Sequence, residues 1–499
     1  MQKKKPNILF IQTDQQRQDT LSCYGGDVCK TPNIDELANE SVVFNNAYTS
    51  SPICTPARAS LQTGLYPMHH GMVTNNYSFG SMVQELPDSP DLLSRRLEKQ
   101  GYSVGYTGKW HLGTGEEELM NEPGYDEYMS TIDYSELRHQ EFAVPTTRGY
   151  EGDDFPGHGY GGFNYQQYKD YLRENNLEYK LENIISGNYD VHQAATVTSP
   201  VESTVSYFLT DRAIKHIEEF SERGNPWYFQ LNFWGPHEPY FAQKDYLDMY
   251  KDIEIEPWPN FYDNNGDKPK IHDVKRANSR EWKDFELYVR HYFAFMTMID
   301  DQVGRVIQYL KDNDLYENTI IIFSSDHGES LGIHGGLSDK AIFMYEETCK
   351  IPLLIKMNGE NQQHHVENRL VGTCDLYSTI LECSGLPNEA VKRDGASLVP
   401  LINQTAANWR EAIVTECSGI DTVLFTQRLI RKGNWKYVFN AGDIDELYNL
   451  TEDPYEMVNL VNKTMYQDVL NRMQDTLEEW MVENRDRLIK QFRLLRDKN

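Results

Sequence analysis

Several features are scarce or missing in this sequence, and each absence excludes a class of protein. The apolar run near the N-terminus, Ile8 to Ile11, is too short for a signal peptide, and no stretch is long and apolar enough to span a membrane. Basic residues are outnumbered, because 48 Lys and Arg stand against 76 Asp and Glu, for a formal charge of −28. Nucleic acids and anionic membranes bind basic surfaces, so we expect neither as a partner. The charge also disfavours long polyanions as substrates, whereas a small anion in a locally basic cleft remains compatible.

Cysteines are few and show no paired spacing. Seven are scattered over 499 residues, which is not a disulfide framework; Cys23 and Cys29 could pair, but we expect free thiols. The sequence contains no internal repeat and no low-complexity tract. Its 39% hydrophobic and 12% aromatic residues can build a large core. As written, the chain is expected in the cytoplasm, or in the periplasm or outside the cell if an export signal has been removed.

Four predicted strands end in polar residues. Apolar runs typical of buried strands cover residues 7–13, 102–107, 227–233 and 319–325. The residues that follow them are, in chain order, Asp14, Lys109 with His111, His237, and Asp326 with His327. In open α/β sheets ligands bind at the carboxyl ends of the strands. The pattern therefore predicts an α/β fold with one composite site.

The remaining segments predict two further features. Residues 115–200 are rich in Tyr, Gly, Glu and Asn and show little periodicity beyond a helix near 165–175, so we expect an insertion over the active face. Beyond Pro400 the strands are shorter, and a final helix is predicted from about 465 to 491. We expect a catalytic domain over 1–395 and a C-terminal subdomain over 396–499.

Cys54 lies at a predicted helix start. Pro56 suits the first turn of a helix, and Gly64 suits its end. Free N–H groups at a helix N-terminus favour an anion, and Arg58, one turn later, has a donor fork that fits a tetrahedral oxyanion. A cysteine in this position is, by itself, more often a buried thiol than a reactive one.

Asp14 and Asp326 are candidate ligands of a hard cation. Two carboxylates, with Gln15 and His327 beside them, suit Ca²⁺ or Mg²⁺, and the imidazole also allows Mn²⁺. Either aspartate alone could instead cap a helix. A thiolate from Cys54 would be a poor ligand for such a cation, whereas an oxygen at that position would be a good one.

The motif C-x-P-x-R at 54–58 resembles the signature of the type I sulfatases, whose cysteine is oxidised to formylglycine. The likeness continues through 59–67, and the segments 108–113, 335–340, 345–347, 351–353 and 446–454 are also similar to sulfatases. The resemblance implies an alkaline-phosphatase/sulfatase-like fold: a doubly wound, mixed, mostly parallel sheet flanked by helices, with a smaller antiparallel C-terminal sheet. It implies hydrolysis of a small organic sulfate, such as a sulfated mono- or oligosaccharide.

The resemblance also implies roles for the site residues. One hydroxyl of the hydrated aldehyde would attack sulfur, His237 with Lys340 would protonate the departing alkoxide, and His111 would take a proton from the second hydroxyl. Partners would be the small sulfated substrate and a formylglycine-generating maturation enzyme. The residues are Cys54, Arg58, Lys109, His111, His237 and Lys340 for catalysis; Asn75, Arg58, Lys109, His237 and Lys340 for substrate; and Asp14, Gln15, Cys54, Asp326 and His327 for one divalent cation, Ca²⁺ first.

Two residues depart from the common sulfatase pattern. Gln15 stands where many sulfatases have a second aspartate, and His327 stands where asparagine is common. This pairing is similar to choline sulfatases and phosphonate monoester hydrolases of the same superfamily. A phosphonate or phosphate ester hydrolase is therefore the nearest alternative, which Lys109 and His111 oppose. An alternative of another class is a non-catalytic protein that holds a metal or an anion.

Overall fold

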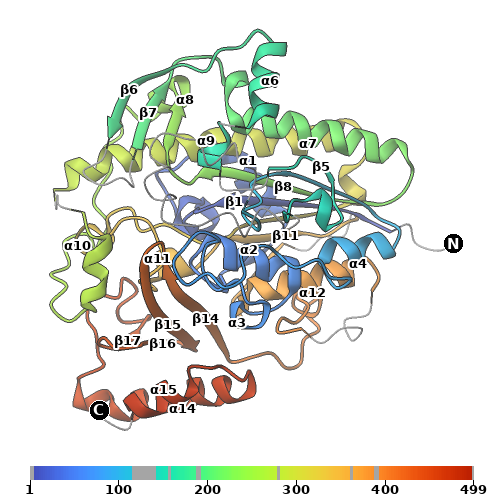
Figure 1. The fold of residues 1–499 in the computed structure, drawn as a ribbon. Coiled ribbons are helices and arrows are strands. Elements are labelled where there is room, and N and C mark those ends of the chain that lie inside the picture. Colours follow the sequence, from blue (N-terminus) through green and yellow to red (C-terminus); the bar gives the residue numbers. More distant parts are fainter. Residues whose placement is uncertain are drawn as a thin grey trace.

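A mixed eight-stranded sheet forms the centre of the molecule (Figure 1). The computed structural model describes residues 5–114, 142–155, 159–163, 165–186, 193–277, 281–359, 364–386 and 393–496. The strand order is β12-β2-β11-β10-β1-β8-β4-β5, and only β11 runs antiparallel to its neighbours. The strands are β1 (Asn7–Asp14), β2 (Val42–Phe44), β4 (Ser103–Gly108), β5 (Glu151–Gly152), β8 (Trp227–Pro236), β10 (Thr319–Ser325), β11 (Leu353–Lys356) and β12 (His365–Glu367).

Helices cover both faces of this sheet, which explains why its strands are apolar throughout. Side chains of β1 alternate between two apolar clusters: Leu9 and Ile11 pack on one face, Ile8 and Phe10 on the other. The first face carries α1 (Pro32–Asn39), α7 (Val205–Glu222) and α9 (Trp282–Asp312). The second carries α2 (Cys54–Thr63), α4 (Leu93–Lys99) and α12 (Thr373–Cys383). The predicted doubly wound, mostly parallel fold is confirmed.

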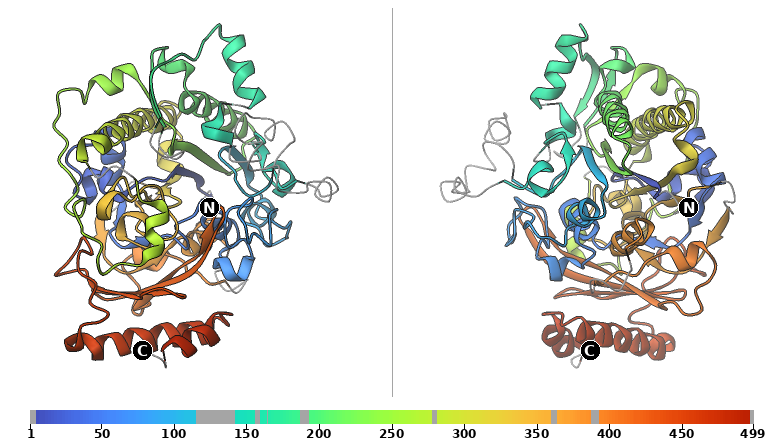
Figure 2. Two further views of the ribbon diagram at one scale, coloured as in Figure 1. Left: turned by 60° about the vertical axis from the view of Figure 1, so that its left-hand side comes forward. Right: turned by 90° about the vertical axis from the view of Figure 1, so that its right-hand side faces the viewer.

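A separate antiparallel sheet follows near the C-terminus, as predicted. It consists of β14 (Ala412–Ile420), β15 (Val423–Lys432), β16 (Trp435–Asn440) and β17 (Glu446–Asn449), in that order. Figures 1 and 2 show the last helices as a layer beneath this sheet. The two described apolar clusters of this region lie on opposite faces of the sheet, one toward the core and one toward the helices.

The single final helix predicted over 465–491 is wrong, because two helices occupy this segment: α14 (Gln467–Glu483) and α15 (Ile489–Arg496). Arg485 has a left-handed φ of 56°, which ends the first helix. Asp486 then accepts from Arg428 Nε at 2.7 Å and from the Leu488 N–H at 2.9 Å. An ion pair to the sheet thus interrupts the helical pattern.

The insertion contains strands that its composition did not indicate. β6 (Leu181–Ser186), β7 (Gln193–Val197) and β9 (Tyr240–Gln243) form a three-stranded sheet above α9, with the predicted helix present as α6 (Gln166–Glu174). β7 pairs with β9 from a distant part of the chain, so local periodicity could not reveal it. Residues 115–141 of the predicted insertion lie outside the described residues.

Short elements complete the described chain. They are η1 (Gln18–Thr20), η2 (Ser22–Tyr24), β3 (Ala47–Tyr48), α3 (Pro67–His70), η5 (Thr146–Arg148), η6 (Gly159–Gly162), η7 (Val201–Ser203), α8 (Lys244–Asp248), η8 (Lys270–Lys275), η9 (Tyr316–Asn318), α10 (Ile333–Gly336), α11 (Glu346–Cys349), β13 (Val371–Gly372), α13 (Val399–Ile402) and η11 (Thr464–Tyr466). Within the described ranges, no helix is both long enough and apolar enough to cross a bilayer. All seven cysteines are unpaired, as expected.

Candidate active site

The four predicted polar strand ends meet at one edge of the central sheet. β10, β1, β8 and β4 are consecutive neighbours and run parallel to one another. Their carboxyl ends therefore lie side by side, with Asp14 ending β1 and Asp326 directly following β10. This arrangement brings together Asp14 and His327, which are 313 positions apart in the sequence.

Cys54 enters this edge as the first residue of α2. Ile53 is extended, Pro56 occupies the first turn, and the Thr55 N–H donates to Asn75 Oδ1 at 3.2 Å. Gly64 ends the helix at a φ of 68°, and a Cβ there would lie 2.8 Å from the Tyr377 ring. Glycine is therefore required at that position both by conformation and by space. The helix holds Cys54 fully buried at the sheet edge.

Cys54 and three buried side chains around it can bind a metal ion. One ligand atom from each of Asp14, Cys54, Asp326 and His327 lies within 4.8 Å of the others. Cys54 Sγ is 3.2 Å from His327 Nε2 and 3.9 Å from Asp14 Oδ1. Two carboxylates and an imidazole fit a divalent cation that prefers oxygen. The thiol is the only soft member of this set.

Positive side chains surround the two carboxylates. Arg58 donates from its terminal nitrogen to Asp14 at 3.0 Å and from Nε to Asp326 at 3.0 Å, and Lys109 Nζ pairs with Asp14. Burial raises the pKa of Asp14, but Lys109 and His237, followed by Arg58, lower it well below its usual value. Asp14 is therefore ionised at neutral pH. Lys109 Nζ also lies 3.6 Å from Cys54 Sγ, so the Lys109 ammonium group lies close to both Asp14 and Cys54.

The neighbours of His327 favour the protonated form of its ring, a proton that it would release on binding a cation. Burial lowers its pKa, but Asp326 and then Cys54 outweigh burial and raise the pKa to about 9. Its Nδ1 lies 2.9 Å from the Gly328 carbonyl, which fixes the ring with Nδ1 as donor and Nε2 toward Cys54. The ring is thus oriented to present Nε2 to the cluster.

Lys340, His237 and Gln15 form a second group beside the first. Lys340 Nζ is 2.8 Å from His237 Nε2 and also donates to Gln15 Oε1. His237 Nδ1 is 2.7 Å from the Glu238 carbonyl, so Nδ1 is the donor and Nε2 accepts from Lys340. Burial, then Lys340 and Lys109, lower the pKa of His237 well below its usual value. The proton of this pair therefore resides on Lys340.

Gln15 is directed toward Lys340 in this structure. Its Nε2 donates to Glu329 and to Asp339 Oδ1 at 3.2 Å, while its Oε1 accepts from Lys340. A left-handed φ of 61° at Gln15 turns the chain directly after the strand. Its role as a metal ligand stays a prediction.

Two carboxylates that sequence reasoning did not assign to the site orient this group. Glu329 accepts from the N–H groups of Leu331 and Asp339, at 3.0 and 2.9 Å. Asp339 pairs with Lys340 at 3.1 Å and with Lys275 at 2.9 Å. Their position, three residues after Asp326 and one before Lys340, was a usable signal. Non-glycine residues in the left-handed region show how tightly this loop is held; they are Leu331, His334, Asp339 and Ala341.

Two other predicted residues lie next to the N-terminus of α2. Thr55 Oγ1 donates to the His111 carbonyl at 2.8 Å, and His111 has a left-handed φ of 55°. Burial, followed by Lys109 and Arg58, lowers the pKa of His111 well below its usual value, so its ring is neutral. Asn75 uses its Oδ1 on the Thr55 N–H, which makes it a helix-capping residue here. Its predicted contact with substrate stays a prediction.

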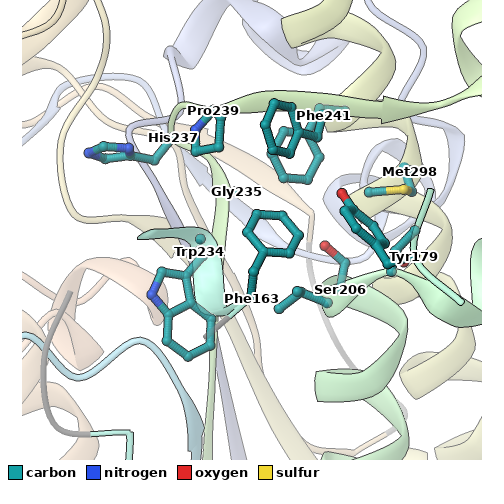
Figure 3. A pocket seen from close by; sticks show the side chains of 13 residues that line it. Phe163, Tyr179, Ser206, Trp234, Gly235, His237, Pro239, Phe241 and Met298 are labelled. Carbon is teal, nitrogen blue, oxygen red and sulfur yellow. The ribbon is translucent and has the colours of Figure 1, made fainter. Parts of the chain in front are cut away.

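A mostly apolar pocket lies on the other side of the turn that carries His237. Figure 3 shows the His237 ring directed away from Phe163, Tyr179 and Met298, which gather across the pocket. Phe163 stands 4.9 Å from Tyr179 and 5.6 Å from Phe241, measured between ring centroids. His237 lines this pocket, whereas Lys340, Gln15 and Cys54 do not.

The sheet edge and its side chains define an α/β enzyme site that combines a metal-ligating cluster with several cationic groups. The Sulfatase family model matches residues 6–386, and a model described as N-sulphoglucosamine sulphohydrolase, C-terminal, matches residues 332–483. The chain belongs to the sulfatase family, within the alkaline-phosphatase superfamily, and it is a sulfatase.

Individual relatives cover nearly the whole chain. The uncharacterized sulfatase YidJ of Escherichia coli strain K12 is 30% identical, over 97% of this chain and 88% of that protein. The N-acetylglucosamine-6-O-sulfatase of Bacteroides thetaiotaomicron is 26% identical over 97% and 87%. The solved phosphonate monoester hydrolase of Agrobacterium radiobacter has a TM-score of 0.74 at 22% identity, covering 96% of each chain. That last likeness shows the fold alone.

Proposed function

We propose that this sulfatase removes sulfate from a small sulfated mono- or oligosaccharide, with formylglycine made from Cys54 as its nucleophile. The observation that carries the proposal is the position of Cys54, where a thiol faces two carboxylates and an imidazole that suit a hard cation. A hydrated aldehyde would supply two hydroxyl groups there, one to attack sulfur and one to allow release of the sulfate. The name of the N-acetylglucosamine-6-O-sulfatase relative supports a sugar as substrate.

The cation would be held by Asp14, Asp326, His327 and the modified Cys54, with Ca²⁺ favoured over Mg²⁺ or Mn²⁺. Carboxylates dominate this donor set, and hard cations prefer them. When bound, the cation would polarise oxygen atoms of the nucleophile and of the sulfate.

The chain's own residues supply charge and protons. Arg58 and Lys109 lie beside Cys54 and can neutralise sulfate oxygens as the transition state forms. Lys340 holds the proton that a departing alkoxide needs, and His237 keeps Lys340 in place through the 2.8 Å contact. His111, neutral and next to the first turn of α2, is the candidate base that removes a proton from the second hydroxyl.

Cys54 must be modified before folding ends. Its side chain is fully buried beneath Lys109 and His327 in the folded chain, out of reach of another enzyme. The maturation enzyme that we propose as a partner would therefore act on the unfolded or nascent chain.

The test combines a substrate panel with mass spectrometry of the Cys54 peptide. We expect an aldehyde at Cys54 and a kcat/KM for sulfate esters at least about tenfold above that for matched phosphate mono- or diesters, which equals roughly 1.4 kcal/mol. Cys54→Ala should abolish turnover, while Cys417→Ala, a buried thiol in β14, should not. Active protein with only unmodified Cys54 would refute the nucleophile, and equal rates on phosphodiesters would favour a phosphonate or phosphate ester hydrolase.

A further inference from the structure

A loop after α3 and the turn between β14 and β15 form a joint rim on the surface. Asp421 in the turn donates its N–H to Ser78 Oγ at 2.9 Å, and its carbonyl accepts from the Phe79 N–H at 2.5 Å. Leu424 packs so closely on Gly80 that a Cβ there would lie 2.6 Å from Leu424 Cδ2. We call residues 75–82 together with 420–424 the rim.

Two chains of contacts connect the rim with the candidate active site. The first starts at the N-terminus of α2, where the Thr55 N–H donates to Asn75 Oδ1, and Ser78 closes a turn by donating its N–H to the Asn75 carbonyl at 2.9 Å. The second runs through ion pairs from Lys340 to Asp339, Lys275 and Asp421. Side-chain exposure rises along this second path, from 3% at Lys340 to 11% at Lys275 and 55% at Asp421. The rim therefore lies where the site approaches solvent.

The rim presents apolar side chains to solvent. Phe79, Met82 and Leu424 are 66%, 83% and 58% exposed. Exposed aromatic and aliphatic side chains that gather beside a site are a sign of ligand contact more often than of packing.

Asn76 adds a polar group to this apolar surface. It follows Asn75 in the chain and is fully buried, and both its Oδ1 and its Nδ2 have no hydrogen-bond partner among the described residues. Leaving a buried amide unpaired destabilises the folded chain. A buried amide in this condition takes its partner from outside the protein chain, either ordered water or a ligand.

An unpaired amide next to an exposed aromatic ring matches the two surfaces of a sugar. A pyranose has an apolar face of C–H groups and an equator of hydroxyl groups, so one partner stacks on it while the other hydrogen-bonds. An aryl or alkyl sulfate would use the apolar face but leave Asn76 unpaired. We propose that the rim is a glycan subsite, where Asn76 binds hydroxyls of the sulfated sugar and Phe79 stacks on the next ring; this rests on the proposed function.

The test measures kcat/KM on three substrates: a sulfated disaccharide, the matching sulfated monosaccharide and 4-nitrophenyl sulfate. We expect Phe79→Ala to lower the value for the disaccharide about tenfold and to leave the other two within about twofold. Asn76→Ala should lower both sugar values about tenfold and spare 4-nitrophenyl sulfate, because that substrate has no hydroxyl to bind. Phe79→Trp should retain disaccharide activity. Met465→Ser, at a site 80% exposed near α14, is the matched control and should change nothing.

The outcomes separate this inference from the proposed function. Sugar turnover that is unchanged in both variants would overturn the rim while keeping a saccharide substrate. Binding of sulfated sugars is measured by calorimetry in Cys54→Ala. If the enzyme turns over 4-nitrophenyl sulfate but neither turns over nor binds sulfated sugars, both the rim and the saccharide proposal are overturned. Thermal unfolding of each variant checks that the fold is intact, and equal losses on all three substrates would mean a structural role and would also overturn the inference.

Discussion

Two adjacent residues, Asp14 and Gln15, face two different groups of side chains. Asp14 faces the metal-ligating cluster with Arg58 and Lys109, whereas Gln15 turns toward Lys340. The left-handed backbone at Gln15 makes this division possible, because a continued strand would send the next side chain to the opposite face of the sheet. At the scale of single residues, the site thus divides into a group around Cys54 and a group around Lys340.

Lys340 should matter most for substrates with poor leaving groups. Because it carries the proton that a departing alkoxide takes up, Lys340→Gln should lower kcat/KM for alkyl or sugar sulfates by about 10²–10⁴-fold. A 4-nitrophenolate leaves without that proton, so 4-nitrophenyl sulfate should lose less than about tenfold. Steady-state kinetics on both substrates measures this, with exposed Lys215→Gln in α7 as control. Equal losses on both would assign Lys340 to sulfate binding instead.

Asp326 should determine whether the protein binds a divalent cation. Asp326→Ala removes one of two buried carboxylates from the cluster, so added Ca²⁺ should raise the melting temperature of the unaltered protein but not that of the variant. Asp211→Ala removes a carboxylate that pairs with Arg305 on the surface and should keep the full shift. Thermal unfolding with Ca²⁺ and with chelator provides the measurement. A preserved shift in Asp326→Ala would place the ion elsewhere.

At the scale of elements, helix α1 depends on a side chain from helix α9. Asp300 accepts from the N–H groups of Asn33 and Ile34, at 3.1 and 2.8 Å, and so satisfies the first turn of α1. Burial outweighs these hydrogen bonds and raises the pKa of Asp300 to about 7. One carboxyl therefore links the two helices that cover the same face of the sheet.

This carboxyl should make stability depend on pH. An unfolded aspartate has a pKa of about 3.9, so between about pH 4 and 7 the folded chain holds a proton that the unfolded chain has lost. The contribution of Asp300 to the free energy of unfolding is then largest below about pH 4 and is lost as the pH rises to about 7. Asp300→Asn should flatten the change between pH 5 and 7 by about 1–3 kcal/mol, measured by urea unfolding. Asp312→Asn, exposed at the end of α9, should not, and an unaltered slope in Asp300→Asn would refute the shift.

At the scale of the whole molecule, a buried ion cluster joins the C-terminal sheet to the core. Lys436 of β16 pairs with Glu456 at 2.6 Å and with Glu346 of α11 at 3.2 Å. Glu346 also accepts from Tyr48 OH at 2.6 Å, which lies in the core. The sheet, the core and the segment near Lys340 therefore meet at one charged contact.

Lys436→Met should weaken this junction strongly. Removing Lys436 leaves Glu456 buried without its cation while Arg431 still pairs with Glu346 at 3.4 Å, and the uncompensated carboxylate costs about 3–5 kcal/mol of unfolding free energy. The double variant Lys436→Met with Glu456→Gln should recover part of that loss, since only one carboxylate stays. Lys432→Met removes a surface pair and should cost less than about 0.5 kcal/mol. Denaturant unfolding of the three variants tests this, and a small loss in Lys436→Met would show that the sheet is held by its apolar contacts alone.

The sequence by itself determined four neighbouring strands of the central sheet, β1, β4, β8 and β10, and the polar residues that follow them. Buried strands can be predicted from local apolar runs, such as 319–325. A polar residue that ends such a run indicates the edge of the sheet where ligands bind. Motifs around Cys54 and Lys109 determined the family, because their spacing reflects contacts along one short segment of chain.

Only the tertiary structure decided the features that depend on partners distant in sequence. It decided that Gln15 faces Lys340, that Lys340 and not His237 holds the proton, and that Glu329 and Asp339 orient both. It also decided the pairing of β7 with β9 and the break before α15. Each of these features depends on hydrogen bonds or ion pairs between segments that are far apart in the chain. Local residue patterns do not reveal such contacts, because the partners are set by the tertiary fold.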